Sequence, residues 1–269
     1  MIAVPTDFAQ MYVAREGESG RAWIATLPAL IDELATAWGL TVDESVLTGH
    51  VGLVCLVERD GQELALKVSY PYEDNVHEGD VLTGWQGDGA VRLLEQDRRH
   101  KALLMERAGP ESLVTHPVDE SIVIIAELWS RMHRHGPLDG AVLTNDAARE
   151  WVTRIPEEWA FLADDLQTDE VVLLHGDLHY ENVLRADREP WLAIDPKCYA
   201  GDRAFEAVSP LWDRLDEITG DRDEGIRARH LQICEAAGFD VVRAAKWSIL
   251  HALEDGDEHG IVPALTQVI

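Results

Sequence analysis

Two short segments of the chain carry acidic and amide side chains at spacings that suit a metal-assisted reaction. They are the run His175-Gly-Asp-Leu-His-Tyr-Glu-Asn182 and the tripeptide Ile194-Asp195-Pro196. Apolar runs precede both segments, so we expect both to lie where buried strands end and polar groups can reach a cleft. Carboxylate and amide oxygens are the hard ligands that Mg²⁺ prefers, and water and phosphate complete its octahedron. Asp177, Asn182 and Asp195 are therefore enough for one metal site and one proton acceptor.

The spacing of the first segment matches the protein-kinase catalytic signature H-R-D-L-x-x-x-N, with Gly176 in place of the arginine. In that chemistry one aspartate accepts or orients the proton of the attacking hydroxyl, while an asparagine and a second aspartate bind magnesium. Those roles fall here to Asp177, and to Asn182 and Asp195, respectively. A charged, proline-containing turn at 184–190 predicts a hairpin that brings Asn182 and Asp195 together. The alternative is two ordinary turns in which each aspartate bonds its own backbone, but that reading does not require this joint spacing.

The N-terminal half supplies a glycine-containing hairpin and a lysine. Two β-rich arms, at 45–57 and 62–70, flank an Asp-Gly pair, which is a strong hairpin signal. Gly49 and Gly52 on the first arm would let backbone N–H groups approach phosphates, and Lys67 on the second arm could reach the same phosphates. Alternatively, two glycines near a strand form only a bulge, and a lysine on a strand is only solvated.

A lysine that contacts phosphates needs a partner to fix its long stem, and Glu78 is the candidate. It opens the segment 76–85, whose apolar residues recur at helical spacing. An ion pair between Lys67 and a helical glutamate is a recurrent part of kinase sites. The alternative is an exposed helical glutamate, and Glu73 or Asp80 could be confused with the true partner.

Two further strands are expected at 90–95 and 101–106, and the chain then breaks at 108–110 with the sequence Ala-Gly-Pro. Such a break predicts a hinge between two lobes. At that hinge the backbone groups of Glu106 and Ala108 could bond an adenine ring.

Beyond the break the pattern becomes helical. Strands first and helices afterwards indicate an α+β protein of two lobes. We expect a nucleotide-binding lobe with a β-sheet at 1–108 and a mainly helical catalytic and substrate-binding lobe at 109–269. The expected helices are 21–40, with a start or kink at Pro28 and a stop at Gly39, and then 118–135, 145–166 with a break at Pro156, 202–217, 224–238 and 241–256, while 16–20 is expected to be a loop.

The chain is strongly acidic, with a formal net charge of −27 from 50 acidic and 23 basic residues among 269. This charge argues against nucleic acid as a partner and would concentrate cationic ligands, although it could also serve only solubility. The apolar runs are too short to span a bilayer, and the start of the chain does not resemble a signal peptide. Three scattered cysteines without a C-x-x-C pair indicate a reducing compartment, so we expect a cytoplasmic protein.

The segment 175–184, together with Ala193-Ile-Asp-Pro-Lys197 and Tyr199-Ala-Gly-Asp202, resembles the aminoglycoside and hydroxyurea antibiotic-resistance kinases. The resemblance extends over nearly the whole chain, and Cys198 departs from it where the family carries a proline. It implies a two-lobed, protein-kinase-like fold that transfers the γ-phosphoryl group of ATP, with Mg²⁺, to a hydroxyl of an antibiotic, most directly a streptomycin-like aminoglycoside. By the same resemblance, the catalytic base is Asp177, the magnesium ligands are Asn182 and Asp195, and the phosphate-anchoring pair is Lys67 with Glu78.

Recognition of a small, cationic, hydroxylated substrate is expected in the helical half. Asp202, Glu206 and Asp213 have spacings that place them on one helix face, where they could receive ammonium or guanidinium groups. Alternatively they form a solvated acidic face, with Asp202 supporting the catalytic loop. Two other functions stay open, a kinase of the same fold acting on a peptide antibiotic, hydroxyurea or a sugar, and a non-catalytic nucleotide-binding protein.

Overall fold

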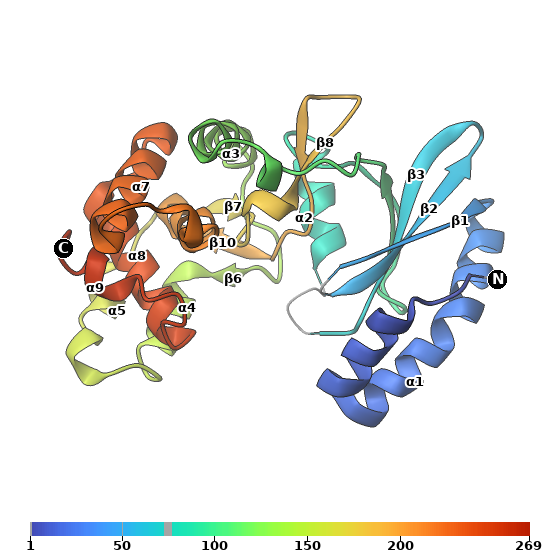
Figure 1. The fold of residues 1–269 in the computed structure, drawn as a ribbon, viewed down its shortest axis with the longest axis horizontal. Coiled ribbons are helices and arrows are strands. Elements are labelled where there is room, and N and C mark those ends of the chain that lie inside the picture. Colours follow the sequence, from blue (N-terminus) through green and yellow to red (C-terminus); the bar gives the residue numbers. More distant parts are fainter. Residues whose placement is uncertain (1, 50, 73–76) are drawn as a thin grey trace. The chain divides into compact units, whose positions relative to one another are not determined.

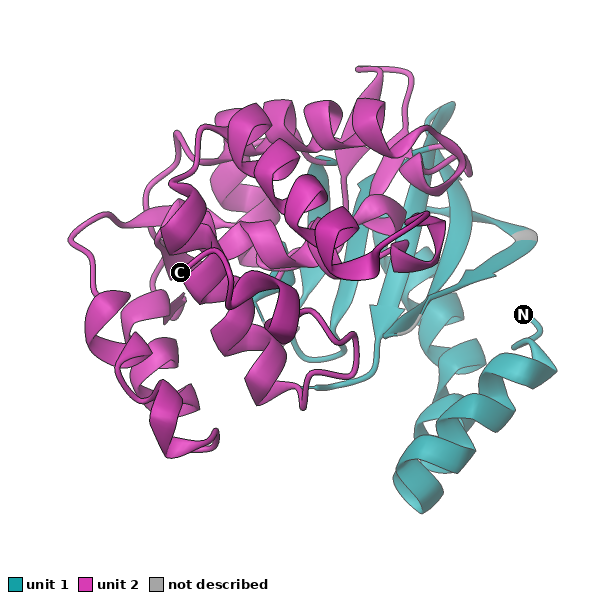
Figure 2. Cartoon of the chain, turned by 60° about the vertical axis from the view of Figure 1, so that its left-hand side comes forward, with its two compact units in different colours: residues 1–79, 91–108 teal, residues 80–90, 109–269 magenta. Residues whose placement is uncertain are grey.

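The computed structural model describes residues 2–49, 51–72 and 77–269. The chain divides into two compact units, residues 1–79 with 91–108, and residues 80–90 with 109–269 (Figure 2). This division differs from the expected one because residues 80–90 group with the second unit. The mixture of sheet and helices confirms the α+β class (Figure 1).

The first unit begins with the long helix α1 (Thr6–Trp38), which changes direction at Gly17 (φ 62°, ψ −128°). A loop was expected at 16–20, but helix continues on both sides of this single glycine. Gly20 is also required, because a Cβ there would lie 2.4 Å from the carbonyl oxygen of Tyr12. Pro28 lies within the helix without a break in its dihedral angles, whereas the expected stop at Gly39 is confirmed by its left-handed φ of 67°.

An antiparallel sheet follows, in the order β1-β2-β3-β5-β4. Its strands are β1 (Thr41–Thr48), β2 (Gly52–Arg59), β3 (Gln62–Ser69), β4 (Leu93–Asp97) and β5 (Ala102–Glu106). The expected Asp-Gly hairpin is confirmed between β2 and β3, where Asp60 and Gly61 both have positive φ, as this turn type requires. The first expected arm is wrong in one respect, because 45–57 is two strands separated by the turn at Gly49 and Gly52.

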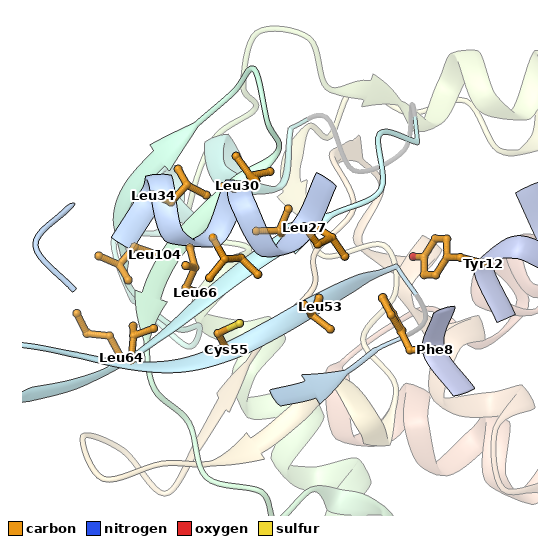
Figure 3. Close-up of a cluster of buried hydrophobic side chains, with 14 residues drawn as sticks. Phe8, Tyr12, Leu27, Leu30, Leu34, Leu53, Cys55, Leu64, Leu66 and Leu104 are labelled. Carbon is orange, nitrogen blue, oxygen red and sulfur yellow. The ribbon is translucent and has the colours of Figure 1, made fainter. Parts of the chain in front are cut away.

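The core of this unit lies between α1 and one face of the sheet (Figure 3). Leu27 and Leu34 from the helix meet Leu53, Leu66 and Leu104 from the strands, all nearly or fully buried. Complete burial of one such side chain contributes roughly 1.5–3 kcal/mol, so this contact fixes the sheet that carries Lys67.

The second unit is mainly helical. Its elements in chain order are α2 (Glu78–Trp85), whose first two residues belong to the first unit, η2 (Leu113–Thr115), α3 (Val118–Met132), β6 (Val142–Leu143), α4 (Thr144–Trp151), η3 (Glu157–Trp159), α5 (Leu162–Asp165), β7 (Val172–Leu174), η4 (Tyr180–Asn182), β8 (Val183–Arg185), β9 (Trp191–Ala193), β10 (Tyr199–Gly201), η5 (Arg203–Ala207), α6 (Val208–Trp212), η6 (Leu215–Glu217), α7 (Arg222–Ala237), α8 (Val241–Glu254) and α9 (Val262–Leu265). Two small sheets, β6-β10-β7 and β8-β9, lie among the helices. Over the described residues, helices of the length and apolarity needed to cross a bilayer are absent.

Two expected helices of this unit are broken. The segment 145–166 forms α4, η3 and α5, with the break at Pro156 as expected. The segment 202–217 forms η5, α6 and η6 rather than one helix, because Asp213 is extended (φ −81°, ψ 151°) and Arg214 adopts a left-handed conformation (φ 54°).

Candidate functional site

The segment 175–182, which matches the kinase catalytic signature and is named the catalytic loop for that match, forms a tight loop after β7 in the second unit. The side-chain amide of Asn182 donates a hydrogen bond to the carbonyl oxygen of Asp177 at 2.8 Å. On the next strand pair, the amide of Ile194 donates to the carbonyl oxygen of Asn182 at 2.9 Å. The hairpin β8–β9 therefore places Asp195 next to the residue that pairs with Asn182, as the turn at 184–190 predicted.

Asp195 itself has a left-handed backbone conformation, with φ 62°. For a residue other than glycine this conformation costs free energy; aspartate adopts it more readily than most, as Asp60 does in its turn, and it also occurs at functional sites. Its position after β9 fits a metal ligand, since only one or two protein oxygens are needed when phosphate and water supply the rest. Among the described residues, three or more His, Cys, Asp or Glu side chains nowhere gather as a metal cluster, and a site of one carboxylate and one amide requires no such cluster.

His175 links the two acidic segments, a role that we did not assign from the sequence. Its Nε2–H donates to the carbonyl oxygen of Ile194 at 2.9 Å, and its Nδ1 accepts from the amide of Asp177 at 3.2 Å. Burial lowers the pKa of His175 to about 4, so the ring is neutral at pH 7 and can fill both roles. Trp85 stacks on it, with ring centroids 5.8 Å apart. The histidine of the H-x-D motif was the available signal.

The environment of Asp177 suits a proton acceptor. Burial raises the pKa of its carboxyl group above the usual range, and the positive charges of His179 and Lys197 oppose this rise. A carboxylate with a raised pKa is a better base. The amide of Lys197 donates to the carbonyl oxygen of His175 at 2.8 Å, which holds the lysine backbone beside this loop.

In the first unit, Lys67 and Glu78 form a buried ion pair. The Nζ of Lys67 lies 2.8 and 2.9 Å from the two carboxylate oxygens of Glu78, and the side chains are only 6% and 4% exposed. The structure therefore brings together the pair that the sequence suggested. Glu73 lies outside the described residues.

The two glycines make the turn between β1 and β2. The amide of Gly49 donates to the carbonyl oxygen of Gly52 at 3.0 Å, and a Cβ at Gly52 would lie 2.7 Å from the carbonyl oxygen of Val68. Only glycine fits so close to β3. Position 50, between the two glycines, lies outside the described residues.

The expected adenine contacts lie at the end of β5. The amide of Glu106 already donates to the carbonyl oxygen of Arg92 at 2.8 Å, so this N–H is not available to a base. Ala108, by contrast, makes no backbone hydrogen bond with any residue that the structure describes.

Two of the three expected substrate acids are committed to internal contacts. Asp202 is 2% exposed, caps η5 by accepting from the amide of Ala204 at 3.0 Å, and also binds Arg243 and, at 2.6 Å, Trp247 Nε1. Glu206 is fully buried and accepts hydrogen bonds from the amides of His175 at 2.6 Å and Gly176 at 2.9 Å.

The expectation that Asp202 and Glu206 contact substrate is therefore wrong. Glu206 holds the catalytic loop instead, and Asp202 supports η5 and α8. Asp213 lies apart from both because the helix ends before it, and its carboxylate lies 3.5 Å from His179 Nδ1.

Comparison with known proteins agrees with this geometry. Residues 37–258 match the family described as aminoglycoside/hydroxyurea antibiotic resistance kinase. The chain is 37% identical to a streptomycin 6-kinase of Streptomyces griseus, over 94% of this chain and 90% of that protein, and 33% identical to a hydroxyurea phosphotransferase of Kitasatospora aureofaciens, over 96% and 82%.

Solved structures share the fold at low sequence identity. A thermostable mutant of an aminoglycoside phosphotransferase, in a ternary complex with ADP and hygromycin B, has a TM-score of 0.56 at 15% identity, covering 88% of this chain and 95% of that one. A choline kinase from Streptococcus pneumoniae has a TM-score of 0.57 at 14% identity, covering 90% and 99%. From the family match and the curated relatives, the chain belongs to the aminoglycoside/hydroxyurea antibiotic resistance kinase family.

Proposed function

We propose that this protein transfers the γ-phosphoryl group of ATP to a hydroxyl of a streptomycin-like aminoglycoside and so inactivates the antibiotic. The proposal depends on the hydrogen bonds that link Asp177 to Asn182 and Asn182 to Ile194, the residue before Asp195. Through these bonds, one loop and one hairpin would supply a base and two metal ligands. The streptomycin 6-kinase relative supports the choice of acceptor.

Asp177 orients the acceptor hydroxyl and takes its proton. Lys67, fixed by Glu78, contacts the phosphates of ATP, and backbone N–H groups of the turn at Gly49 and Gly52 lie over them. Most of the rate gain comes from positioning and charge neutralisation, since the loose transition state of phosphoryl transfer needs little covalent help.

Asn182 and Asp195 would hold magnesium, which when bound neutralises charge on the phosphate oxygens. Their oxygens suit this ion, and the imposed left-handed backbone of Asp195 is the observation that favours a ligand role. His175 keeps the two segments in register through its bonds to Asp177 and Ile194.

The acidity of the chain supports a cationic acceptor. With a net charge of −27, the protein attracts guanidinium or ammonium groups and repels ATP, so the local lysine and magnesium must overcome the background field. We also propose that the enzyme works in the cytoplasm, where its three cysteines, all free and buried, stay reduced; fractionation of producing cells tests this.

The test is ADP release with streptomycin as acceptor, with and without magnesium. The variant Asp177→Asn removes the base while keeping its shape, so we expect turnover to fall by roughly 10²-fold or more. Asp187→Asn, the same change at an exposed residue of the β8–β9 turn, is the control and should keep full turnover. Unchanged turnover in Asp177→Asn would refute the proposed base.

Hydroxyurea is the second candidate acceptor, because one relative is a hydroxyurea phosphotransferase at 33% identity. The same assay with hydroxyurea, a peptide antibiotic and common sugars decides between acceptors by their kcat/KM values. If ATP binds but no acceptor raises ADP release, the chain is a nucleotide-binding protein without this activity.

A further inference from the structure

Asp213 lies at a corner of the chain in the second unit that hydrogen bonds hold in place. It follows the last residue of α6, and the next residue, Arg214, has a left-handed backbone with φ 54°. The guanidinium of Arg229, 7% exposed, donates to the carbonyl oxygens of Asp213 at 2.7 Å and of Arg214 at 3.1 Å. These bonds fix the direction of the chain at the corner, and with it the position of the Asp213 side chain.

The carboxylate of Asp213 faces the catalytic loop. Its Oδ1 accepts from the amide of Arg214 at 2.8 Å, whereas its Oδ2 is buried and receives no hydrogen bond of good geometry from the described residues. That oxygen lies 3.5 Å from Nδ1 of His179. A buried carboxylate oxygen needs a donor, and the Nδ1–H of this imidazole is the group placed to supply it.

His179 belongs to the same loop as the proposed base. Its amide donates to the carbonyl oxygen of Asp177 at 3.1 Å, and its own carbonyl oxygen accepts from the amide of Asn182 at 3.1 Å. Burial alone would lower the pKa of His179, but the carboxylates of Asp213 and Asp177 raise it above its ordinary value. Its side chain is 24% exposed, so part of the ring is accessible to a ligand.

We propose that His179 is a substrate-contacting residue and that Asp213 is the positioning residue that orients its ring. With Nδ1 directed at Asp213, the other ring nitrogen, Nε2, is left for an oxygen of the acceptor ring next to the hydroxyl that Asp177 activates. Asp213 therefore acts through His179 rather than by binding an ammonium or guanidinium group itself. This inference rests on the proposed kinase activity and assigns part of its acceptor site.

The first test separates acceptor binding from ATP binding in the variant His179→Ala. Loss of one hydrogen bond predicts a roughly 2- to 12-fold rise in KM for streptomycin, with KM for ATP unchanged. His100→Ala is the matched control, because His100 forms a similar pair with Asp97, with side chains 28% and 30% exposed, outside the catalytic loop. An equal rise in both KM values in His179→Ala would overturn the proposal.

Two conservative variants identify the nitrogen that matters. The amide of glutamine approximates the position of Nε2 and that of asparagine approximates Nδ1, so His179→Gln should bind streptomycin better than His179→Asn does. The reverse order would mean that only the bond to Asp213 matters, which contradicts a substrate contact. Melting temperatures of all variants are measured, and the Gln and Asn pair decides the question if the Ala variant does not fold.

A double-mutant cycle tests the role of Asp213. If Asp213 acts through His179, Asp213→Asn raises KM for streptomycin and the double variant with His179→Ala is no worse than His179→Ala alone. If the KM increases of the two single variants multiply in the double variant, Asp213 contacts the substrate directly, and its positioning role is overturned. A wild-type enzyme without streptomycin-dependent ADP release refutes the proposed function, whereas an active wild type with unaffected His179 variants refutes this inference alone.

Discussion

The buried carboxylate of Glu206 provides the sharpest test of how the catalytic loop is held. The variant Glu206→Gln keeps the size of the side chain but turns one carboxylate oxygen into an NH₂ group. In the wild type both oxygens accept from backbone amides, of His175 at 2.6 Å and Gly176 at 2.9 Å. In the variant one of these amides faces a donor and becomes a buried, unsatisfied N–H.

The magnitude follows from these two bonds. An unsatisfied buried donor costs about 1–3 kcal/mol, and replacing the charged acceptor of the other bond by a neutral one costs about 1 kcal/mol more. Relief from burying a charge offsets part of this loss. We therefore expect the free energy of unfolding of the second unit to fall by a net amount of about 1–3 kcal/mol, which corresponds to a drop in melting temperature of roughly 2–12 °C.

The assay is thermal and urea unfolding followed by circular dichroism, together with turnover below the melting temperature. Glu235→Gln, the same change at an exposed position of α7, is the control and should stay within about 0.5 kcal/mol of the wild type. Turnover of Glu206→Gln should also fall, because the loop that carries Asp177 loses an anchor. If Glu206→Gln has the same melting temperature and urea midpoint as Glu235→Gln, the carboxylate of Glu206 does not hold the loop.

Two further predictions concern the buried ion pair and a buried histidine. The variant Lys67→Met leaves Glu78 as an unpaired buried carboxylate, so urea unfolding should show that the free energy of unfolding falls by about 3–5 kcal/mol, and kinetics should show a raised KM for ATP. Adding Glu78→Leu removes the unpaired charge and should restore stability but not ATP affinity. A double variant that is no more stable than Lys67→Met would contradict this prediction. Burial lowers the pKa of His175 from 6.5 to about 4, so between these values the unfolded chain binds a proton that the folded protein does not, and stability should rise with pH across this window. Melting temperatures from pH 4 to 7 should therefore rise less steeply in His175→Gln than in the wild type, and an equal slope would contradict the assignment.

Local signals in the sequence were sufficient for part of the fold. The Asp-Gly turn between β2 and β3 and the glycine stop of α1 were predicted correctly, because each depends on the backbone preference of one or two residues. The closeness of Asn182 and Asp195 followed from a hairpin with a short turn. In these cases neighbouring residues decide the structure, and a single sequence contains that information.

Contacts between distant segments were not readable in the same way. The spacing of Asp202 and Glu206 fits an exposed acidic face equally well, and only contacts with Arg243 and with the loop at His175 decide that both are internal. Gly17 was interpreted as part of a loop, although its positive φ serves a change of direction within a helix whose arms are stabilised by packing. These incorrect predictions have the same cause, because contacts between distant segments override the local preference of the chain.

The left-handed backbone of Asp195 places stability and activity in opposition at one residue. Glycine would relieve about 1 kcal/mol of conformational strain there, yet it would delete an oxygen of the proposed magnesium site. Laboratory evolution that rewards heat resistance alone would therefore drift toward inert enzymes at this position. Continuous antibiotic challenge would be the pressure that keeps the aspartate.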